Sequence, residues 1–198
     1  MDFKSALQTL TDRGFNPYPP APHIRVPHAK EALLSGIKYY MGDRAQWLPC
    51  YDEVADWLTD NHGKGLLCVG ECGLGKTLIC TCVLPVILHH YCGKILSVYS
   101  ATSLAARFNE ARADKLLVVD DLGTEPAESI SFGERHVYFN ELADIAEKHG
   151  NLLIITSNLR TRSKPGYQSI EDTYGIRTLD RLNALCKTVT FRGKSMRQ

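Results

Sequence analysis

The amino-acid sequence predicts an α/β protein, with a parallel five-stranded sheet covered by helices on both faces in a three-layer α/β/α arrangement. Short apolar runs alternate with helix-compatible segments from residue 66 onward, which is typical of parallel strands buried on both faces. A glycine-rich loop follows the first of these runs, and a pair of acidic residues follows the third. Loops at the carboxyl edge of such a sheet are the usual place for a ligand, so the loop and the alternation support the same architecture.

The predicted elements divide the chain after residue 48. Residues 1–48 are expected to form an N-terminal extension, with helices over 2–13 and 28–40 around an extended proline-rich linker at 17–22. Residues 49–198 are expected to form the α/β domain. Its predicted strands lie at 66–69, 95–99, 116–119, 152–156 and 188–191, and its helices at 51–61, 77–89, 103–112, 134–148 and within 170–185. Pro85 is expected to kink or restart its helix, because proline has no backbone N–H.

Composition sets broad limits on the protein's class. The chain has 198 residues, 44% hydrophobic and 23% charged, with a formal net charge of +1, so bulk charge indicates no partner. Its start lacks the apolar core of a signal peptide, and its longest apolar run, 78–88, is too short to cross a bilayer. We therefore expect a cytoplasmic protein with no membrane partner. Seven cysteines without zinc spacing are interpreted mostly as buried small side chains.

Residues 70–77 match the phosphate-loop pattern G-x-x-x-x-G-K-[ST]. Its glycines allow the chain to wrap so that successive N–H groups converge on a polyphosphate. Lys76 would place a cation on the β- and γ-phosphates of ATP, and Thr77 would offer its hydroxyl to Mg²⁺ at the start of a helix. A glycine-rich structural turn is the alternative, but a strand precedes this loop and a helix-compatible run follows it. The predicted nucleotide-binding residues are Gly70, Glu71, Cys72, Gly73, Leu74, Gly75, Lys76 and Thr77.

Polar side chains follow two later strands. Asp120 and Asp121 end one apolar run. At the end of a strand beside the phosphate-loop strand, Asp120 would reach the hydration shell of Mg²⁺, and Asp121 would polarise the attacking water as general base. A plain acidic turn is the alternative. The next strand ends near Asn158, and either Asn158 or Thr156 could hydrogen-bond the γ-phosphate or the water.

Basic residues gather in the last part of the chain. Arg177 and Arg181 are four apart on one predicted helix face, where one of them could neutralise transition-state charge. A surface ion pair, for example with Asp180 or Glu171, is the alternative. From Arg160 to the end there are nine Lys or Arg against three acids. That excess could serve phosphates, a nucleic acid or a neighbouring subunit, or could be a solvated surface.

The order of the motifs resembles the DnaC/IstB-like branch of AAA+ ATPases, among the AAA+/RecA-like P-loop NTPases. This branch comprises replicative helicase loaders and the ATPase subunits of some transposition systems. The resemblance covers roughly residues 50–197 and is carried by residues 70–77 and by Leu-Val-Val-Asp-Asp-Leu-Gly, Ile-Ile-Thr-Ser-Asn-Leu, Asp-Arg-Leu and Phe-Arg-Gly-Lys-Ser-Met-Arg. No helical lid domain follows the last predicted strand, which is compatible with this branch.

The resemblance implies a Mg²⁺-dependent ATPase that forms a homo-oligomer when active and loads or remodels a hexameric helicase or a transposase. It also implies single-stranded DNA as a partner, although the segment 100–115 is shorter than in helicase loaders. An ATP-gated adaptor for transposition and a small-molecule kinase, with residues 160–164 as its lid, are the other functions considered. The resemblance assigns Lys76 and Thr77 to nucleotide and Mg²⁺, Asp120 and Asp121 to metal and water, Asn158 to the first sensor, and Arg181, or else Arg177, to an arginine finger.

Overall fold

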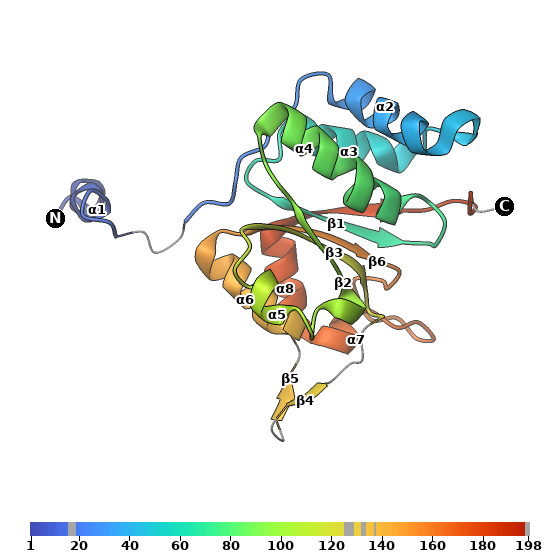
Figure 1. Cartoon of the computed structure of the whole chain (residues 1–198). Helices are drawn as coiled ribbons and strands as arrows, with labels where there is room; N and C mark the ends of the chain where they lie inside the picture. Colours follow the sequence, from blue (N-terminus) through green and yellow to red (C-terminus); the bar gives the residue numbers. More distant parts are fainter. Residues whose placement is uncertain (16–18, 125–128, 132–133, 137, 197–198) are drawn as a thin grey trace.

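A five-stranded parallel sheet in the order β2-β3-β6-β1-β7 forms the centre of the protein (Figure 1). The computed structural model describes residues 1–15, 19–124, 129–131, 134–136 and 138–196; the predicted linker residues 17 and 18 and Arg197 lie outside these ranges. The parallel five-stranded sheet is confirmed. Its strands are β1 (Gly65–Gly70), β2 (Ser97–Ser100), β3 (Leu116–Leu122), β6 (Leu152–Ser157) and β7 (Cys186–Phe191).

Helices cover both faces of this sheet, which confirms the three-layer arrangement (Figure 1). Side chains along a strand alternate between two cores: in β1, Leu66 and Cys68 belong to one, and Leu67 and Val69 to the other. Both faces of the central strands β1, β3 and β6 are therefore buried, as the continuous apolar runs predict. The first face packs on α2 (Ala29–Met41), α3 (Pro49–Thr59) and α4 (Leu84–Cys92), and the second on α5 (Phe108–Ala111), α6 (Tyr138–His149), α7 (Ile170–Tyr174) and α8 (Ile176–Leu185).

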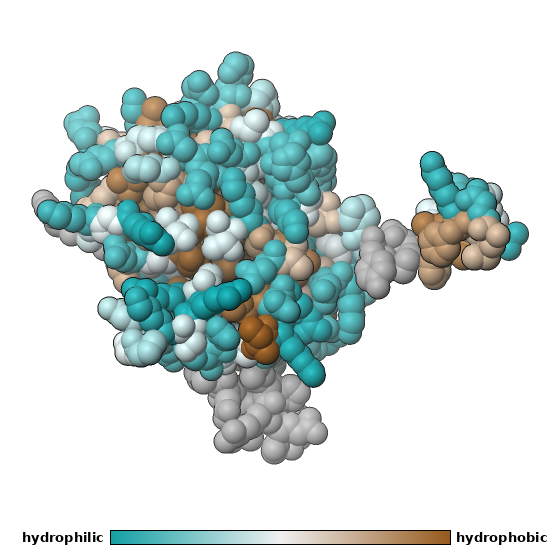
Figure 2. Space-filling model, turned by 180° about the vertical axis from the view of Figure 1, so that it is seen from behind, coloured by the Kyte–Doolittle hydropathy of each residue, from teal (hydrophilic) through white to brown (hydrophobic). Residues whose placement is uncertain are grey.

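The first core includes part of the predicted N-terminal extension. Ile24 and Val26 are buried in it, together with three residues of α2, so packing is continuous across the predicted boundary. Only α1 (Phe3–Thr11) stands apart, since it buries none of its residues. Figure 2 shows it projecting from the body with hydrophobic atoms along one side. Among the described residues, no helix combines the length and the apolar character that crossing a membrane requires.

Two predicted helices are wrong in extent. The helix expected over 103–112 is reduced to α5, a single turn after a 3₁₀ turn, η3 (Ala101–Ser103). The helix expected from residue 134 begins at Tyr138, because the residues before it pair in an antiparallel hairpin of β4 (Ser129–Ser131) and β5 (Glu134–His136). Periodicity alone overestimates such helices, because a short helix is stable only where tertiary packing supports it.

The helix after the phosphate loop restarts near Pro85, as predicted. Wide π-type turns, η2 (Leu78–Val83), lead into α4, which carries Pro85 in its first turn. Proline is tolerated there because the first N–H groups of a helix have no intrahelical partner. The last predicted helix is likewise divided at Gly175, whose φ of 84° separates α7 from α8. A further 3₁₀ turn, η1 (Gly42–Arg44), ends α2.

The cysteines behave largely as expected. Four of the seven are buried and all are free thiols. Burial raises the pKa of the Cys186 thiol to about 12 and that of Cys50 to about 11. These two side chains therefore remain protonated and act as small apolar groups at neutral pH.

Candidate functional site

The phosphate loop lies at the carboxyl edge of the sheet, between β1 and η2. Gly73 and Gly75 have φ angles of 77° and 81°, in the left-handed region that favours glycine. A Cβ on Gly73 would collide with the Ser195 hydroxyl, and a Cβ on Gly75 would lie 2.7 Å from Oη of Tyr51. Both positions therefore require glycine for backbone conformation and for space.

Lys76 directs its ammonium group into this loop. The residue is 6% exposed, and its Nζ donates hydrogen bonds to the carbonyl oxygens of Gly70, at 2.9 Å, and Glu71, at 2.7 Å. The loop thus holds a cation at the start of a helix, where N–H groups without intrahelical partners also point outward. That combination is suited to an anion such as a polyphosphate.

Asp120 and Asp121, at the end of β3, are both held by Thr156 of β6. The Thr156 hydroxyl donates to Oδ1 of Asp120 at 2.6 Å and accepts from the backbone N–H of Asp121 at 2.8 Å. Asp121 has a φ of 60°, a left-handed conformation that aspartate tolerates better than most residues. The pairing of β3 with β6 shifts register at this point. Beyond the shift, Oδ1 of Asp121 accepts a hydrogen bond of 2.9 Å from Nδ2 of Asn158.

The strand that carries the acids does not adjoin the phosphate-loop strand, contrary to expectation. β6 lies between β3 and β1. Its end therefore supplies the two polar groups nearest the acids, and the structure separates their roles. Thr156 is buried and is a positioning residue for Asp120. Asn158 is exposed and faces the space above the loop.

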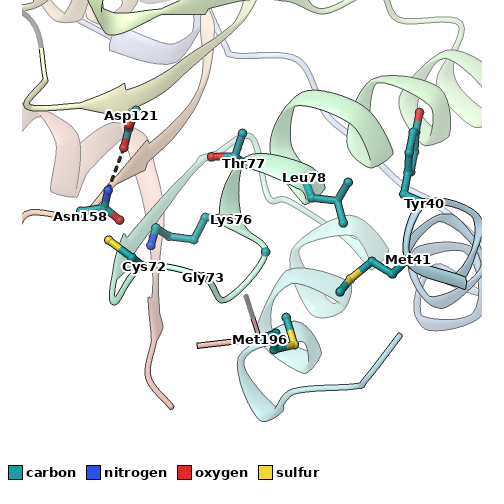
Figure 3. A pocket seen from close by; sticks show the side chains of 11 residues that line it. Tyr40, Met41, Cys72, Gly73, Lys76, Thr77, Leu78, Asp121, Asn158 and Met196 are labelled. Atoms are coloured by element: carbon teal, nitrogen blue, oxygen red, sulfur yellow. Dashed lines mark hydrogen bonds between the residues drawn. The ribbon is translucent and has the colours of Figure 1, made fainter. Parts of the chain in front are cut away.

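A cavity of about 280 Å³ opens above the loop. Asp121 and Asn158 lie on one side of the loop, and the Thr77 hydroxyl points toward that side (Figure 3). Apolar side chains line the other side (Figure 3). The cavity therefore has a polar end for charged groups and an apolar end for a planar ring. Its lining residues are Tyr40, Met41, Cys72, Gly73, Gly75, Lys76, Thr77, Leu78, Asp121, Asn158 and Met196.

Sequence reasoning missed the apolar end of the cavity. Tyr40 and Met41 are contributed by α2, about thirty residues before the loop, and Met196 by the segment after β7. Met196 is fixed there because its backbone N–H donates to the Gly73 carbonyl at 2.9 Å. In the sequence, Met196 was marked only by the Phe-Arg-Gly-Lys-Ser-Met-Arg motif. The family resemblance includes this motif but assigns it no role.

Tyr51 is a further residue that sequence reasoning did not single out. Its hydroxyl donates to the Leu74 carbonyl at 3.0 Å, beneath the loop. Burial raises the pKa of Tyr51 well above its ordinary value, so the hydroxyl stays protonated and remains a donor. Tyr51 therefore supports the loop backbone from the core side.

Several predicted site residues lie outside the cavity lining. Leu74 is buried in the core, and Glu71 accepts a hydrogen bond from the N–H of Gly193 at 3.0 Å. Gly70 contributes its carbonyl to Lys76, and Asp120 is engaged by Thr156. These residues can therefore affect the cavity only indirectly, through the residues that line it.

The two arginines are not part of this cavity either. Arg181 forms ion pairs with two acids of α6, Asp144 at 2.7 Å and Glu147 at 2.9 Å. These differ from the pairs expected with Asp180 or Glu171. Arg177 is exposed on α8. Neither guanidinium lines the cavity of its own chain. An arginine that completes the site of a neighbouring subunit would likewise lie away from its own phosphate loop.

On the expectation from the sequence that Asp120 serves Mg²⁺ in nucleotide hydrolysis, Thr156→Val should raise the Mg²⁺ concentration needed for half-maximal activity. Valine keeps the volume but leaves the Asp121 N–H without its acceptor and frees Asp120 to move, at a stability cost of about 1–3 kcal/mol. Thr156→Ser keeps the hydroxyl and should retain the Mg²⁺ response of the parent protein. A Mg²⁺ titration of the activity, with thermal denaturation alongside, distinguishes the two. An unchanged Mg²⁺ response in the valine variant would remove Thr156 from the positioning role.

Comparison with known proteins supports the fold. No protein-family model and no curated protein matches the chain. Among solved structures, DnaI superimposes with a TM-score of 0.52 at 17% identity, over 68% of this chain and 73% of DnaI. The DnaC helicase loader follows with a TM-score of 0.49 at 16% identity, over 85% and 93% of the two chains. AMPPCP-bound DnaA from Aquifex aeolicus has a TM-score of 0.45 at 14% identity, over 68% and 42%.

The parallel sheet, its helical layers on both faces and the loop after β1 form a three-layer α/β/α fold similar to that of DnaI. The expected α/β/α fold is therefore confirmed by its likeness to DnaI. At 17% identity this likeness establishes fold and leaves activity to the residues of the site.

Proposed function

We propose that this protein binds ATP with Mg²⁺ in the cavity and hydrolyses it. The observation that carries the proposal is the convergence of Lys76 with Asp121 and Asn158, which come from the ends of three different strand–loop units at one sheet edge. Lys76 would neutralise charge on the β- and γ-phosphates. Asp121 would accept a proton from the attacking water, and Asn158, already bonded to Asp121, would orient that water.

The residues around the polar end fit a magnesium ion. Hydroxyl and carboxylate oxygens are the ligands that Mg²⁺ takes in nucleotide sites. We assign its binding to the Thr77 hydroxyl and to Asp120, one of whose oxygens is already engaged by Thr156. When bound, Mg²⁺ would neutralise charge that develops on the phosphates.

The apolar end fits the nucleotide base. Tyr40, Met41, Leu78 and Met196 offer a ring, an aliphatic surface and two adaptable thioethers to a planar heterocycle. The proposed preference for adenine over guanine rests on the family resemblance of the motifs.

We further propose that hydrolysis drives loading or remodelling of a DNA-processing partner, a hexameric helicase in the first place. The likeness to the DnaI fold and the order of the motifs support this function. In this proposal the protein forms a homo-oligomer when active, and an arginine of one subunit completes the ATP site of the next.

Phosphate release from ATP, measured with and without Mg²⁺, tests the central proposal. Hydrolysis should require Mg²⁺ and should proceed with water alone. Turnover that depends on an added small acceptor would instead make the protein a kinase. Light scattering with ATP, single-stranded DNA and a hexameric helicase then tests the partner, because loading requires an ATP-dependent complex.

Arg177→Ala should lower hydrolysis in the assembled protein while leaving ATP affinity and thermal stability unchanged, because Arg177 is exposed and available to a neighbour. Arg181→Ala should chiefly reduce stability, since it breaks two partly exposed ion pairs with α6. A mixing experiment separates the roles. Lys76→Ala subunits retain Arg177, so adding them to Arg177→Ala subunits should restore activity. No gain on mixing would exclude Arg177 as the residue given in trans.

A further inference from the structure

The helices α2 and α4, neighbours in Figure 1, enclose a groove of about 680 Å³. Its lining residues all lie within 28–40 and 83–91, and we call it the α2–α4 groove. A Cβ on Gly36 would collide with the side chain of Val83, so this glycine lets the two segments approach each other closely. The groove therefore has a closed floor, with open space between the two helices above it.

Exposed apolar side chains are concentrated in this groove and around α1. In the described part of the chain thirteen large hydrophobic residues are exposed, of which five lie within residues 1–15 and four line the groove. The four in the groove are Tyr39, Tyr40, Val86 and Tyr91. An isolated exposed apolar residue is normal, whereas a group of them marks a surface that binds something.

The helix α1 presents an apolar stripe that is left exposed. Phe3, Leu7 and Leu10 are 69%, 39% and 47% exposed, and their spacing of i, i+4 and i+7 places them on one side of the helix. A helix of nine residues is marginal in water by itself, and it gains most of its stability by packing its apolar side on another element. The stripe of α1 therefore requires a surface to pack on.

The α2–α4 groove fits this stripe in length and in chemistry. Its lining runs from His28 to Tyr40, about 18 Å along α2, whereas the stripe from Phe3 to Leu10 is about 10 Å long. An amphipathic helix that lays side chains at i, i+4 and i+7 into an apolar groove between helices is a common mode of recognition. The charges also agree. Glu31, the one acid among the lining residues, is exposed, and α1 carries a cation beside its stripe, at Lys4.

The path of the chain favours α1 of the same molecule as the occupant of the groove. Residues 12–23 connect α1 to the buried Ile24, and His28, at one end of the groove, follows shortly after. A connection of this length can span up to about 40 Å, more than the length of the groove. Because the connection makes the encounter intramolecular, the effective concentration of α1 at the groove is of about millimolar order.

We propose that α1 docks in the α2–α4 groove of its own chain. Phe3, Leu7 and Leu10 then enter the groove and contact Tyr39 and Val86, and Lys4 lies at the rim near Glu31. Figure 2 shows α1 standing away from the body, which is the undocked arrangement. Since α1 buries none of its residues there, docking breaks no contact of the core.

Docking reaches the nucleotide cavity through Tyr40, which lines both the groove and the apolar end of the cavity. A helix in the groove restricts this ring, so that the base meets a surface that is already ordered. Docking of α1 and nucleotide binding therefore favour each other reciprocally. This link rests on the proposed ATP site, whereas docking itself is measured without nucleotide.

Amide hydrogen exchange of the full chain, measured without nucleotide on the segment 2–13, tests the docking. A docked state that holds about 90% of the molecules slows exchange in α1 about tenfold relative to the free helix. Leu7→Lys and Val86→Lys should each remove this slowing. Lysine has the helix propensity of leucine, so Leu7→Lys removes the apolar contact and keeps the helix. Exchange in β1 and β6 should be unchanged, because both substituted positions are exposed.

Gln8→Lys and His89→Lys are the matched controls. They add the same charge at exposed positions, on α1 away from the stripe and on α4 outside the groove lining, and both should keep the slow exchange. Lys76→Ala should also keep it, which separates docking from any failure of the proposed ATP site. The proposal is overturned if α1 exchanges as fast in the parent protein as in Leu7→Lys, or if Val86→Lys leaves its exchange slow. Slow exchange that is lost on dilution would also overturn it, because α1 would then dock on a second copy.

Discussion

Lys76→Ala should abolish ATP binding and hydrolysis while leaving the fold intact. The ammonium group is the one cation among the residues that line the described cavity, and it lies where the loop's carbonyl groups already hold it. Removing a group that stabilises transition-state charge lowers turnover by about 10²–10³-fold, before any loss of affinity. Water at the edge of the cavity can donate hydrogen bonds to the two carbonyl oxygens in place of Lys76. The loss of folding stability should therefore be small.

Calorimetry with a non-hydrolysable ATP analogue, together with phosphate release, measures both effects. Lys94→Ala is a control of the same charge change, at a partly exposed position after α4 and outside the cavity lining. It should behave like the parent protein. If Lys76→Ala bound and hydrolysed ATP normally, the loop would be a structural turn and the proposed function would fail.

The fold could be predicted because its signals are local. The central strands are apolar runs buried on both sides, and every predicted strand overlaps an observed one. Strand order could not be predicted in this way, because which strands adjoin depends on how distant segments pack. The position of β6 between β1 and β3 is such a case: it explains why Thr156, and no residue of β1, holds Asp120.

The candidate site likewise contains residues that the local sequence identifies and residues that depend on the packing of distant segments. The loop and the two acids carry their chemistry in adjacent residues, so a motif identifies them. Tyr40 and Met196 are ordinary residues in sequence and become cavity residues only because α2 and the last segment meet above the loop. The left-handed backbone of Asp121 also had no sequence signal, since the register shift that produces it involves the pairing of two strands.

Asp121→Asn should retain ATP binding but lower turnover by about 10²–10⁴-fold, the usual contribution of a general base. Asparagine matches aspartate in size and accepts the left-handed φ of 60°, so the backbone at the end of β3 should not change. Its side-chain oxygen can still accept the hydrogen bond from Asn158. The substitution thus removes the basic carboxylate and little else.

Single-turnover hydrolysis and nucleotide affinity, measured on the same preparation, separate chemistry from binding. Asp56→Asn, on the exposed side of α3, is the control for loss of one negative charge and should hydrolyse ATP at the parent rate. Equal hydrolysis by Asp121→Asn and the parent protein would exclude Asp121 as the base. Asp120→Asn would then be the next variant to measure, because Thr156 holds the Asp120 carboxylate at the same strand end. In that case Asp120 would be the candidate base and Asp121 the candidate Mg²⁺ ligand.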